Sequence, residues 1–206
     1  MTRDAELFVL AEDVLVEVIG RVRGEDRTIE MRPMADRDGD VAESIRRRLA
    51  RHVGDDLQIP DLLAGREPED PGSVHEVLGD DAAGAARAAA QKACAAARSV
   101  DDDAAAAGLL RRLTIERALL SHEIAMHLGS RACPLTEELA RGLCELTEPE
   151  AERARWVAEG LFREPLTPFP DGVSWRDRWL MVTGRDPHPF VDHRSGLSDS
   201  RRGSLQ

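Results

Sequence analysis

Three ionisable residues recur at helical spacing inside the apolar stretch that covers residues 109–129. At about 100° per residue, Glu123 and His127 project within roughly 20° of Glu116. The apolar residues of the same stretch point to that side too, namely Leu109, Leu113, Leu120 and Ile124. The pattern predicts a helix that places two carboxylates and an imidazole on its inward face.

Charged groups on an inward face need a partner, because an unpaired buried charge is very costly. That partner could be a metal ion, a shared proton, an arginine from another helix or a hydrated pocket. Glu123 and His127 lie one helical turn apart, which suits two ligands of one ion. Three protein ligands with an open position would form a catalytic Zn, Ni or Fe centre.

A second expected helix, over residues 41–56, contributes another ionisable residue. His52 continues its apolar stripe of Val41, Ile45 and Leu49, and Asp56 lies about 40° further round, so that it too could face inward. Imidazole and carboxylate groups from facing helices build the metal sites of helical bundles. The candidate catalytic and metal-binding residues are therefore His52, Glu116, Glu123 and His127.

Simpler interpretations exist for each of these residues. A buried histidine such as His52 is often only hydrogen-bonded to a backbone carbonyl, and Glu116 could pair with Arg46 or Arg178. Other polar residues of the 109–129 stretch, Arg117 and His122 among them, point away from the stripe, and His122 is expected at the surface. The second histidine falls one residue late for the HExxH motif of zinc proteases.

Composition narrows the class of protein. A chain of 206 residues with 33% charged and 42% hydrophobic residues is typical of one soluble globular domain. A net charge of -11 argues against nucleic-acid binding, because phosphate contacts need clustered Lys and Arg. No segment suggests a membrane span, and the acidic start of the chain does not resemble a secretion signal, so a cytoplasmic protein is expected. Three scattered cysteines without a CxxC motif are expected to be reduced, and none has an obvious base beside it.

The hydrophobic periodicity predicts an all-α protein with no convincing strand. Residues 25–40 are expected to form an ordered loop that could cover a site, and residues 66–75 a polar loop. The expected helices cover residues 4–24, 41–56, 80–100, 104–128, 135–146, 148–160 and 174–184.

Three segments resemble a known family. LARHVGDDLQIPDLLAGR at 49–66, IERALLSHEIAMHLG at 115–129 and DRWLMVTGRDP at 177–187 are similar to blocks of the DinB/YfiT-like superfamily, in its actinobacterial branch of mycothiol-dependent maleylpyruvate isomerases. The resemblance implies a DinB-like four-helix bundle domain over residues 1–187 with additional short C-terminal helices. It also implies a homodimer. The residues beyond Pro187 are polar and irregular, so residues 188–206 are expected to form a flexible tail.

Members of this family hold a divalent metal on a histidine of helix two and on a Glu-x-x-x-His pair of a later helix. His52 and Glu116 match the first two ligands, whereas Leu120 stands where the second histidine is expected. Either Glu123 or His127 supplies the missing ligand, or the site has lost its metal and kept its pocket.

The resemblance implies an enzyme that acts on a small-molecule substrate. With a metal, the ion would activate the thiolate of mycothiol towards an electrophile, because a bound cation lowers the pKa of a thiol. Without one, the four candidate residues would act as general acid and base in the isomerisation, cyclisation or elimination of a biosynthetic intermediate. The alternative is a non-catalytic binding or scaffold protein of the same fold whose buried charges form internal ion pairs.

Overall fold

The computed structural model describes residues 1–31, 42–100, 103–130 and 132–188. This part of the chain is predominantly helical, so the all-α prediction is confirmed. The main helices are α1 (Arg3–Ile19), α2 (Ile45–Leu63), α4 (Ala82–Arg98), α5 (Ala104–His127), α6 (Glu137–Thr147), α7 (Glu150–Ala158) and α8 (Trp175–Val182). The shorter elements are the 3₁₀ helix η1 (Glu25–Thr28), the strands β1 (Glu30–Met31) and β2 (Glu43–Ser44), and the helix α3 (Val74–Leu78).

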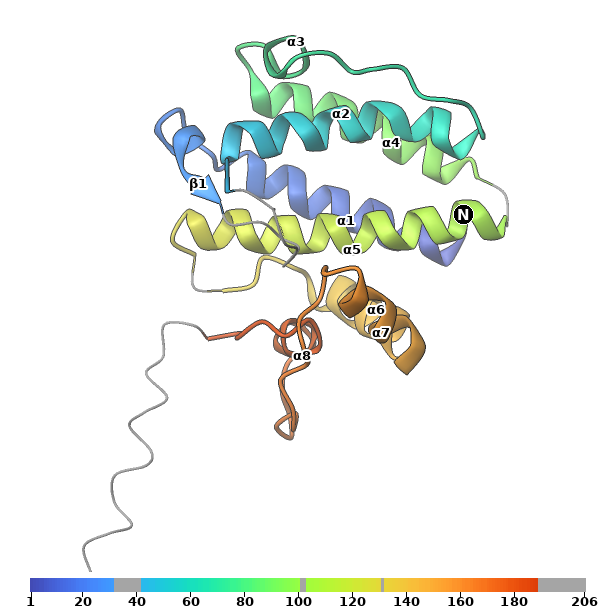
Figure 1. Ribbon diagram of the computed structural model, residues 1–206, viewed down its shortest axis with the longest axis vertical. Coiled ribbons are helices and arrows are strands. Elements are labelled where there is room, and N and C mark those ends of the chain that lie inside the picture. The colour runs from blue at the N-terminus through green and yellow to red at the C-terminus, as the bar shows by residue number, and fades with distance from the viewer. Residues whose placement is uncertain (32–41, 101–102, 131, 189–206) are drawn as a thin grey trace, which may run out of the picture.

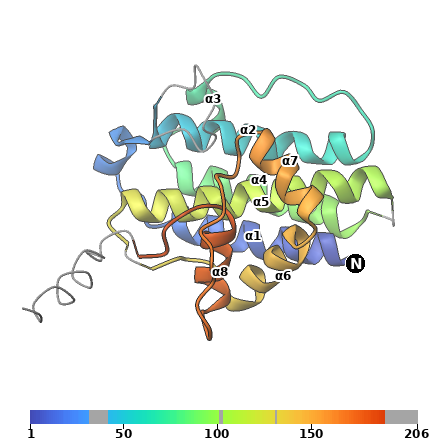
Figure 2. The same ribbon diagram turned by 60° about the horizontal axis from the view of Figure 1, so that its bottom comes forward.

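The four long helices run side by side, with α6, α7 and α8 on one side of them (Figure 1). Helix α1 packs on α5 and on α4, and α2 packs on α4. The pair α1 and α5 lies between the α2 and α4 pair and the short helices (Figure 1), and turning the molecule brings the short helices α6, α7 and α8 in front of the long ones (Figure 2). Helix α5 is therefore covered on two sides.

Side-chain caps fix where most of these helices begin. The Ser44 hydroxyl accepts a hydrogen bond from the backbone N–H of Arg47 at the start of α2, and Asp103 accepts one from Ala106 at the start of α5. Ser174 caps α8 through the N–H of Asp177, as the sequence predicted. Each cap satisfies a donor that the first turn of a helix would otherwise leave unpaired.

Helix α2 continues beyond its predicted end at residue 56. It runs through Pro60 to Leu63. Ile59 is fully buried against Cys94 and Leu110, and this packing favours the extra helical turn despite the missing proline N–H.

The prediction that the chain has no strand was wrong for two very short segments. β1 and β2 pair antiparallel, with Glu30 opposite Ser44. Two residues are too few for an alternating pattern to show in the sequence. The pairing fixes the start of α2, where the N–H of Ile45 also donates to the carbonyl of Ile29.

The loop expected over 25–40 lies mostly outside the described residues, as does the tail from residue 189 onward. The described cysteines Cys94, Cys133 and Cys144 are free and buried, in agreement with the prediction. Within the described ranges, every helix is too short or too polar to cross a lipid bilayer.

Candidate metal centre

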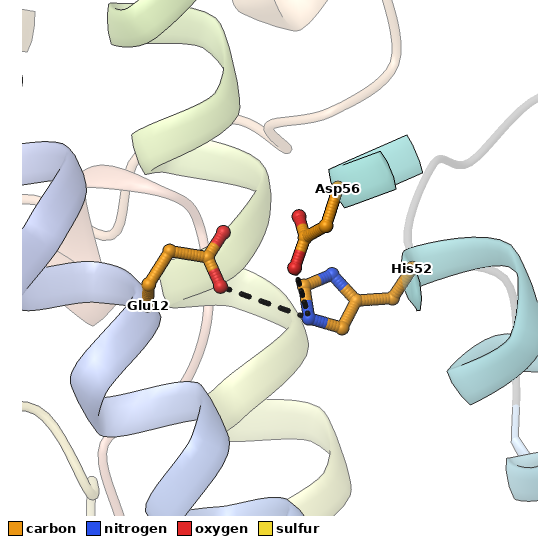
Figure 3. Close-up of side chains that lie close together, drawn as sticks. All are labelled: Glu12, His52 and Asp56. Atoms are coloured by element: carbon orange, nitrogen blue, oxygen red, sulfur yellow. Dashed lines mark ion pairs between the residues drawn. The ribbon is translucent and has the colours of Figure 1, made fainter. Parts of the chain in front are cut away.

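Three buried side chains from α1 and α2 bring possible metal ligands together. Each of Glu12, His52 and Asp56 offers one ligand atom, and these atoms lie within 4.8 Å of one another. His52 Nε2 is 3.3 Å from Asp56 Oδ2 and 3.7 Å from Glu12 Oε2 (Figure 3). All three side chains are almost completely buried, with exposed fractions of 0%, 2% and 0%. Within the described residues, this is the group of three that could hold an ion.

The sequence places these groups inward because each lies on a buried helix stripe. Glu12 stands between Phe8 and Leu15 on α1, and both neighbours are fully buried. On α2, His52 and Asp56 are four residues apart and therefore share one face. Leu49 and Ile59 on the same helix are buried too, so the two polar side chains are carried into the interior.

Arg117 reaches the same place from α5. Its Nε donates to Glu12 Oε1 at 2.8 Å, and its Nη2 donates to Asp56 Oδ1 at 2.7 Å. Arg117 is itself only 3% exposed. We call Glu12, His52, Asp56 and Arg117 the inner cluster.

The hydrogen bonds of Arg117 use one oxygen of each carboxylate. The other oxygens, Glu12 Oε2 and Asp56 Oδ2, are buried without a hydrogen-bond partner, as are both ring nitrogens of His52. Such orphaned polar atoms are rare in folded proteins and call for a proton, an ion or a water. Two of the orphaned oxygens and one orphaned nitrogen face each other in this structure.

Burial controls the protonation of the inner cluster. Burial raises the pKa of Asp56 to about 8, although the Arg117 charge opposes this shift. The pKa of Glu12 is raised for the same reason. Burial, followed by the positive charge of Arg117, lowers the pKa of His52 well below its usual value. Near neutral pH, His52 therefore has a lone pair to offer, and the carboxyl pair retains a proton when no cation is bound.

The pKa of Arg117 is raised, which keeps its charge fixed. Burial alone would lower this pKa, but the adjacent carboxylates of Asp56 and Glu12 outweigh burial. The two carboxylates and the guanidinium together carry a net charge of -1 when both acids are ionised. A further cation is therefore electrostatically acceptable at this site.

The spacing of the two carboxylate oxygens around His52 Nε2 suits a transition metal. Zinc bonds to histidine nitrogen and carboxylate oxygen at about 2.0–2.2 Å, so its tetrahedral ligands lie about 3.3 Å apart. The observed separations of 3.3 and 3.7 Å around His52 Nε2 are near that value. One imidazole and two carboxylates form a donor set found for Zn, Ni and Fe.

The structure brings only His52 of the four predicted site residues into this centre. Glu116 is partly exposed and accepts a hydrogen bond from Arg112 Nε at 2.9 Å, so its partner is neither Arg46 nor Arg178. Glu123 pairs with Arg185 Nη2 at 3.0 Å. The ring Nδ1 of His127 lies 2.7 Å from the carbonyl oxygen of Glu123. The predicted cluster of His52 with Glu116, Glu123 and His127 is therefore not formed.

The prediction chose the wrong face of α5, for a physical reason. Because α5 is covered on two sides, apolar residues surround it and mark no single inward stripe. Ile115 and Leu119 pack with the short helices, whereas Leu120 and Ile124 pack with α2 and α4. The face that meets the inner cluster carries Arg117, which the sequence analysis had directed outward.

His122 was also misplaced. It was expected at the surface but is only 6% exposed. Burial, together with the nearby charge of Arg185, lowers its pKa to about 4. His122 is therefore neutral at physiological pH.

Sequence reasoning missed Glu12 and Arg117 and left Asp56 outside the site. Asp56 was expected to face inward, and it does. The signal for Glu12 was available, because Phe8, Glu12 and Leu15 follow helical spacing. The sequence around Arg117 contains no comparable signal that this residue faces the interior.

Cys94 of α4 lies close enough to the inner cluster for Glu12 to affect it. Burial, and then the Glu12 charge, raise the pKa of this thiol to about 12. The thiol therefore remains protonated at physiological pH, and nucleophilic attack by Cys94 is disfavoured.

Described pockets lie away from the inner cluster. One of about 450 Å³ is lined by Val18, Arg21 and Leu128, among others, and another of about 400 Å³ by Pro60, Ala96 and Asp103, among others. Neither includes a residue of the inner cluster.

Comparisons with protein-family models, with curated proteins and with solved structures found no match.

Proposed function

We propose that this protein binds one divalent transition-metal ion through Glu12, His52 and Asp56. The observation that carries this proposal is the convergence of Glu12 Oε2, Asp56 Oδ2 and His52 Nε2, all buried and all without a hydrogen-bond partner. A single cation would satisfy all three atoms at once, which removes the cost of burying them unpaired. Zn, Ni and Fe fit the donor set.

The activity we propose is that of a DinB-like enzyme acting on a small molecule. Three protein ligands would leave one coordination position, which a substrate or thiol would reach when the side chains that bury the site move apart, and the resemblance of the sequence to mycothiol-dependent isomerases suggests mycothiol in that role. A metal there would lower the pKa of the bound thiol. Glu12 and Asp56 would be ionised in this state, because one oxygen of each would bond to the metal and the other accepts a hydrogen bond from Arg117. The DinB-like arrangement, the homodimer and the cytoplasmic location belong to the same proposal.

A second candidate is a non-catalytic binding or scaffold protein in which the inner cluster is only an internal ion network. The observation in its favour is that Arg117 already makes short hydrogen bonds to both carboxylates. In this case the proton held by the carboxyl pair replaces the metal. His52 then serves to fill the interior.

Metal analysis of the protein purified without chelator separates the two candidates. We expect about one Zn, Ni or Fe per chain, either as purified or after dialysis against the metal and gel filtration. His52→Ala should abolish this stoichiometric metal, whereas the matched control His127→Ala should retain it. Failure of the folded wild-type protein to retain any of the three metals would favour the internal ion network.

Activity requires a separate assay. Wild-type protein loaded with metal should accelerate the addition of a low-molecular-weight thiol to a small electrophile, and His52→Ala should not. If the protein retains metal but leaves a panel of thiols and electrophiles unchanged, the metal site stands and the enzymatic part of the proposal is wrong.

A further inference from the structure

The contacts of Arg117 bear on which metal the centre accepts. Its guanidinium holds Glu12 Oε1 and Asp56 Oδ1, which come from two different helices. The opposite oxygens, Oε2 and Oδ2, are the ones that approach His52 Nε2. Each carboxylate therefore uses one oxygen to accept a hydrogen bond from Arg117 and has the other oxygen available for an ion.

We infer that Arg117 determines the metal selectivity of this centre. By occupying one oxygen of each carboxylate, it restricts Glu12 and Asp56 to one metal bond apiece and so favours a four-coordinate ion such as Zn²⁺ over Mg²⁺ and Ca²⁺. The inference rests on the proposed metal site. It assigns to Arg117, which is not itself a metal ligand, the role of positioning the two carboxylates that are.

The coordination needs of the ions explain this preference. Ca²⁺ takes six to eight oxygen ligands and often binds a carboxylate through both oxygens. Mg²⁺ requires an octahedral arrangement that usually includes several waters. Here three protein atoms converge, one is an imidazole nitrogen, and the surrounding side chains are buried. Zn²⁺ is satisfied by such a set with one further ligand.

The fork of Arg117 is needed for this arrangement. Nε and Nη2 belong to one planar guanidinium, and their N–H bonds point in fixed directions. They therefore orient the two carboxylates at the same time. A lysine ammonium keeps the positive charge but is a single point of charge on a flexible chain. Arg117→Lys therefore separates the positioning role from simple neutralisation.

The wild-type protein gives the first test. Loaded with Co²⁺, it should show the intense visible absorption of a four-coordinate ion, and Zn²⁺ should displace Co²⁺ while excess Mg²⁺ or Ca²⁺ does not. A weak six-coordinate Co²⁺ spectrum, or displacement by Mg²⁺ or Ca²⁺, would overturn the inference. This test needs no variant. Failure to bind either Co²⁺ or Zn²⁺ would instead overturn the proposed metal site along with the inference.

Arg117→Lys and the matched control Arg112→Lys give the second test. Arg112 is an exposed arginine of the same helix that forms ion pairs with Glu116 and Glu159. In Arg117→Lys, the preference for Zn²⁺ over Mn²⁺ should fall roughly 10- to 100-fold, the range found when groups that orient metal ligands are removed. Its Co²⁺ spectrum should shift towards higher coordination, and Arg112→Lys should match the wild type.

An unchanged preference and spectrum in folded Arg117→Lys would show that Arg117 only neutralises charge, which overturns the inference. Circular dichroism establishes that the variant is folded. If Arg117→Lys does not fold, Arg117→Gln, which keeps a side-chain N–H donor but lacks the guanidinium fork, is compared with the wild type in the same two measurements, and an unchanged preference and spectrum would again overturn the inference.

Discussion

Glu116 and Arg117 are adjacent in the sequence but belong to two different kinds of charged region. Arg117 lies in the inner cluster, where every side chain is less than about a tenth exposed. Glu116 lies in a more exposed ion pair with Arg112, which we call the outer pair; the Arg112 and Glu116 side chains are 46% and 21% exposed. Removing one charge from a buried set leaves the others uncompensated, whereas water replaces a lost partner at the surface. A charged residue of the same type can therefore contribute strongly to stability in one region and very little in the other.

The largest expected difference between the regions is in stability. Arg117→Met should lower the free energy of unfolding by about 3–5 kcal/mol, because it leaves two buried carboxyl groups without their cation. Arg112→Met, on the same helix, should change it by at most about 1 kcal/mol. Urea denaturation of both variants measures this contrast. Equal losses of stability in the two variants would mean that the inner cluster contributes no more to stability than a surface ion pair does.

The dependence of stability on pH should also distinguish the regions. In metal-free protein, burial raises the pKa of Asp56 from 3.8 to about 8. The folded form then binds the proton more tightly than the unfolded chain, so this stabilisation is complete below about pH 4 and is lost as the pH rises through about 8.

Asp56→Asn resembles the protonated acid and removes this titration. Relative to the wild type, the variant should become progressively less destabilised between about pH 5 and about pH 8. Asp61→Asn, a partly exposed control on the same helix, should show no such trend. Urea denaturation in the presence of chelator tests this, and parallel pH profiles for Asp56→Asn and the wild type would contradict it.

A metal should stabilise the inner cluster but not the outer pair. Zn²⁺ at about 100 times its dissociation constant should raise the free energy of unfolding by about 2.7 kcal/mol, because it binds the folded form. The gain should vanish in His52→Ala and persist in His127→Ala. Denaturation with Zn²⁺ and with chelator measures both variants, and loss of the gain in His127→Ala alone would place the metal at His127 instead.

The smallest effect is expected at Glu116 itself. Glu116→Gln should change the free energy of unfolding by at most about 1 kcal/mol, because its partner Arg112 is exposed. Zn²⁺ affinity, measured by competition with a chromophoric chelator, should stay unchanged. A loss of affinity comparable to that of His52→Ala would restore Glu116 as a ligand.

The helices were largely predictable because their periods and caps are local properties. The alanine-rich segment and the long helix that ends before Gly129 were found nearly within their limits, at Ala82–Arg98 and Ala104–His127. Gly129 has a φ of 83°, which suits its predicted role just beyond the helix end. The strands β1 and β2 were missed because long-range pairing, rather than local sequence, defines them.

The site was only partly predictable from the sequence. The helical period tells which side of a helix a residue faces, but it does not tell which other helix packs on that side. His52 was placed correctly by the single buried stripe of α2. Helix α5 has neighbours on two sides, so the same reasoning selected Glu116 and missed Arg117. Glu12 required knowing that α1 brings its interior face towards His52.

The most direct test is the anomalous diffraction of crystals grown with Zn²⁺, recorded at the zinc edge. If the inner cluster binds the metal, one strong internal peak should lie about 2.0–2.2 Å from Glu12 Oε2, Asp56 Oδ2 and His52 Nε2. A peak bound instead by Glu123 or His127, or no peak within the bundle, would show that the inner cluster is not the metal site.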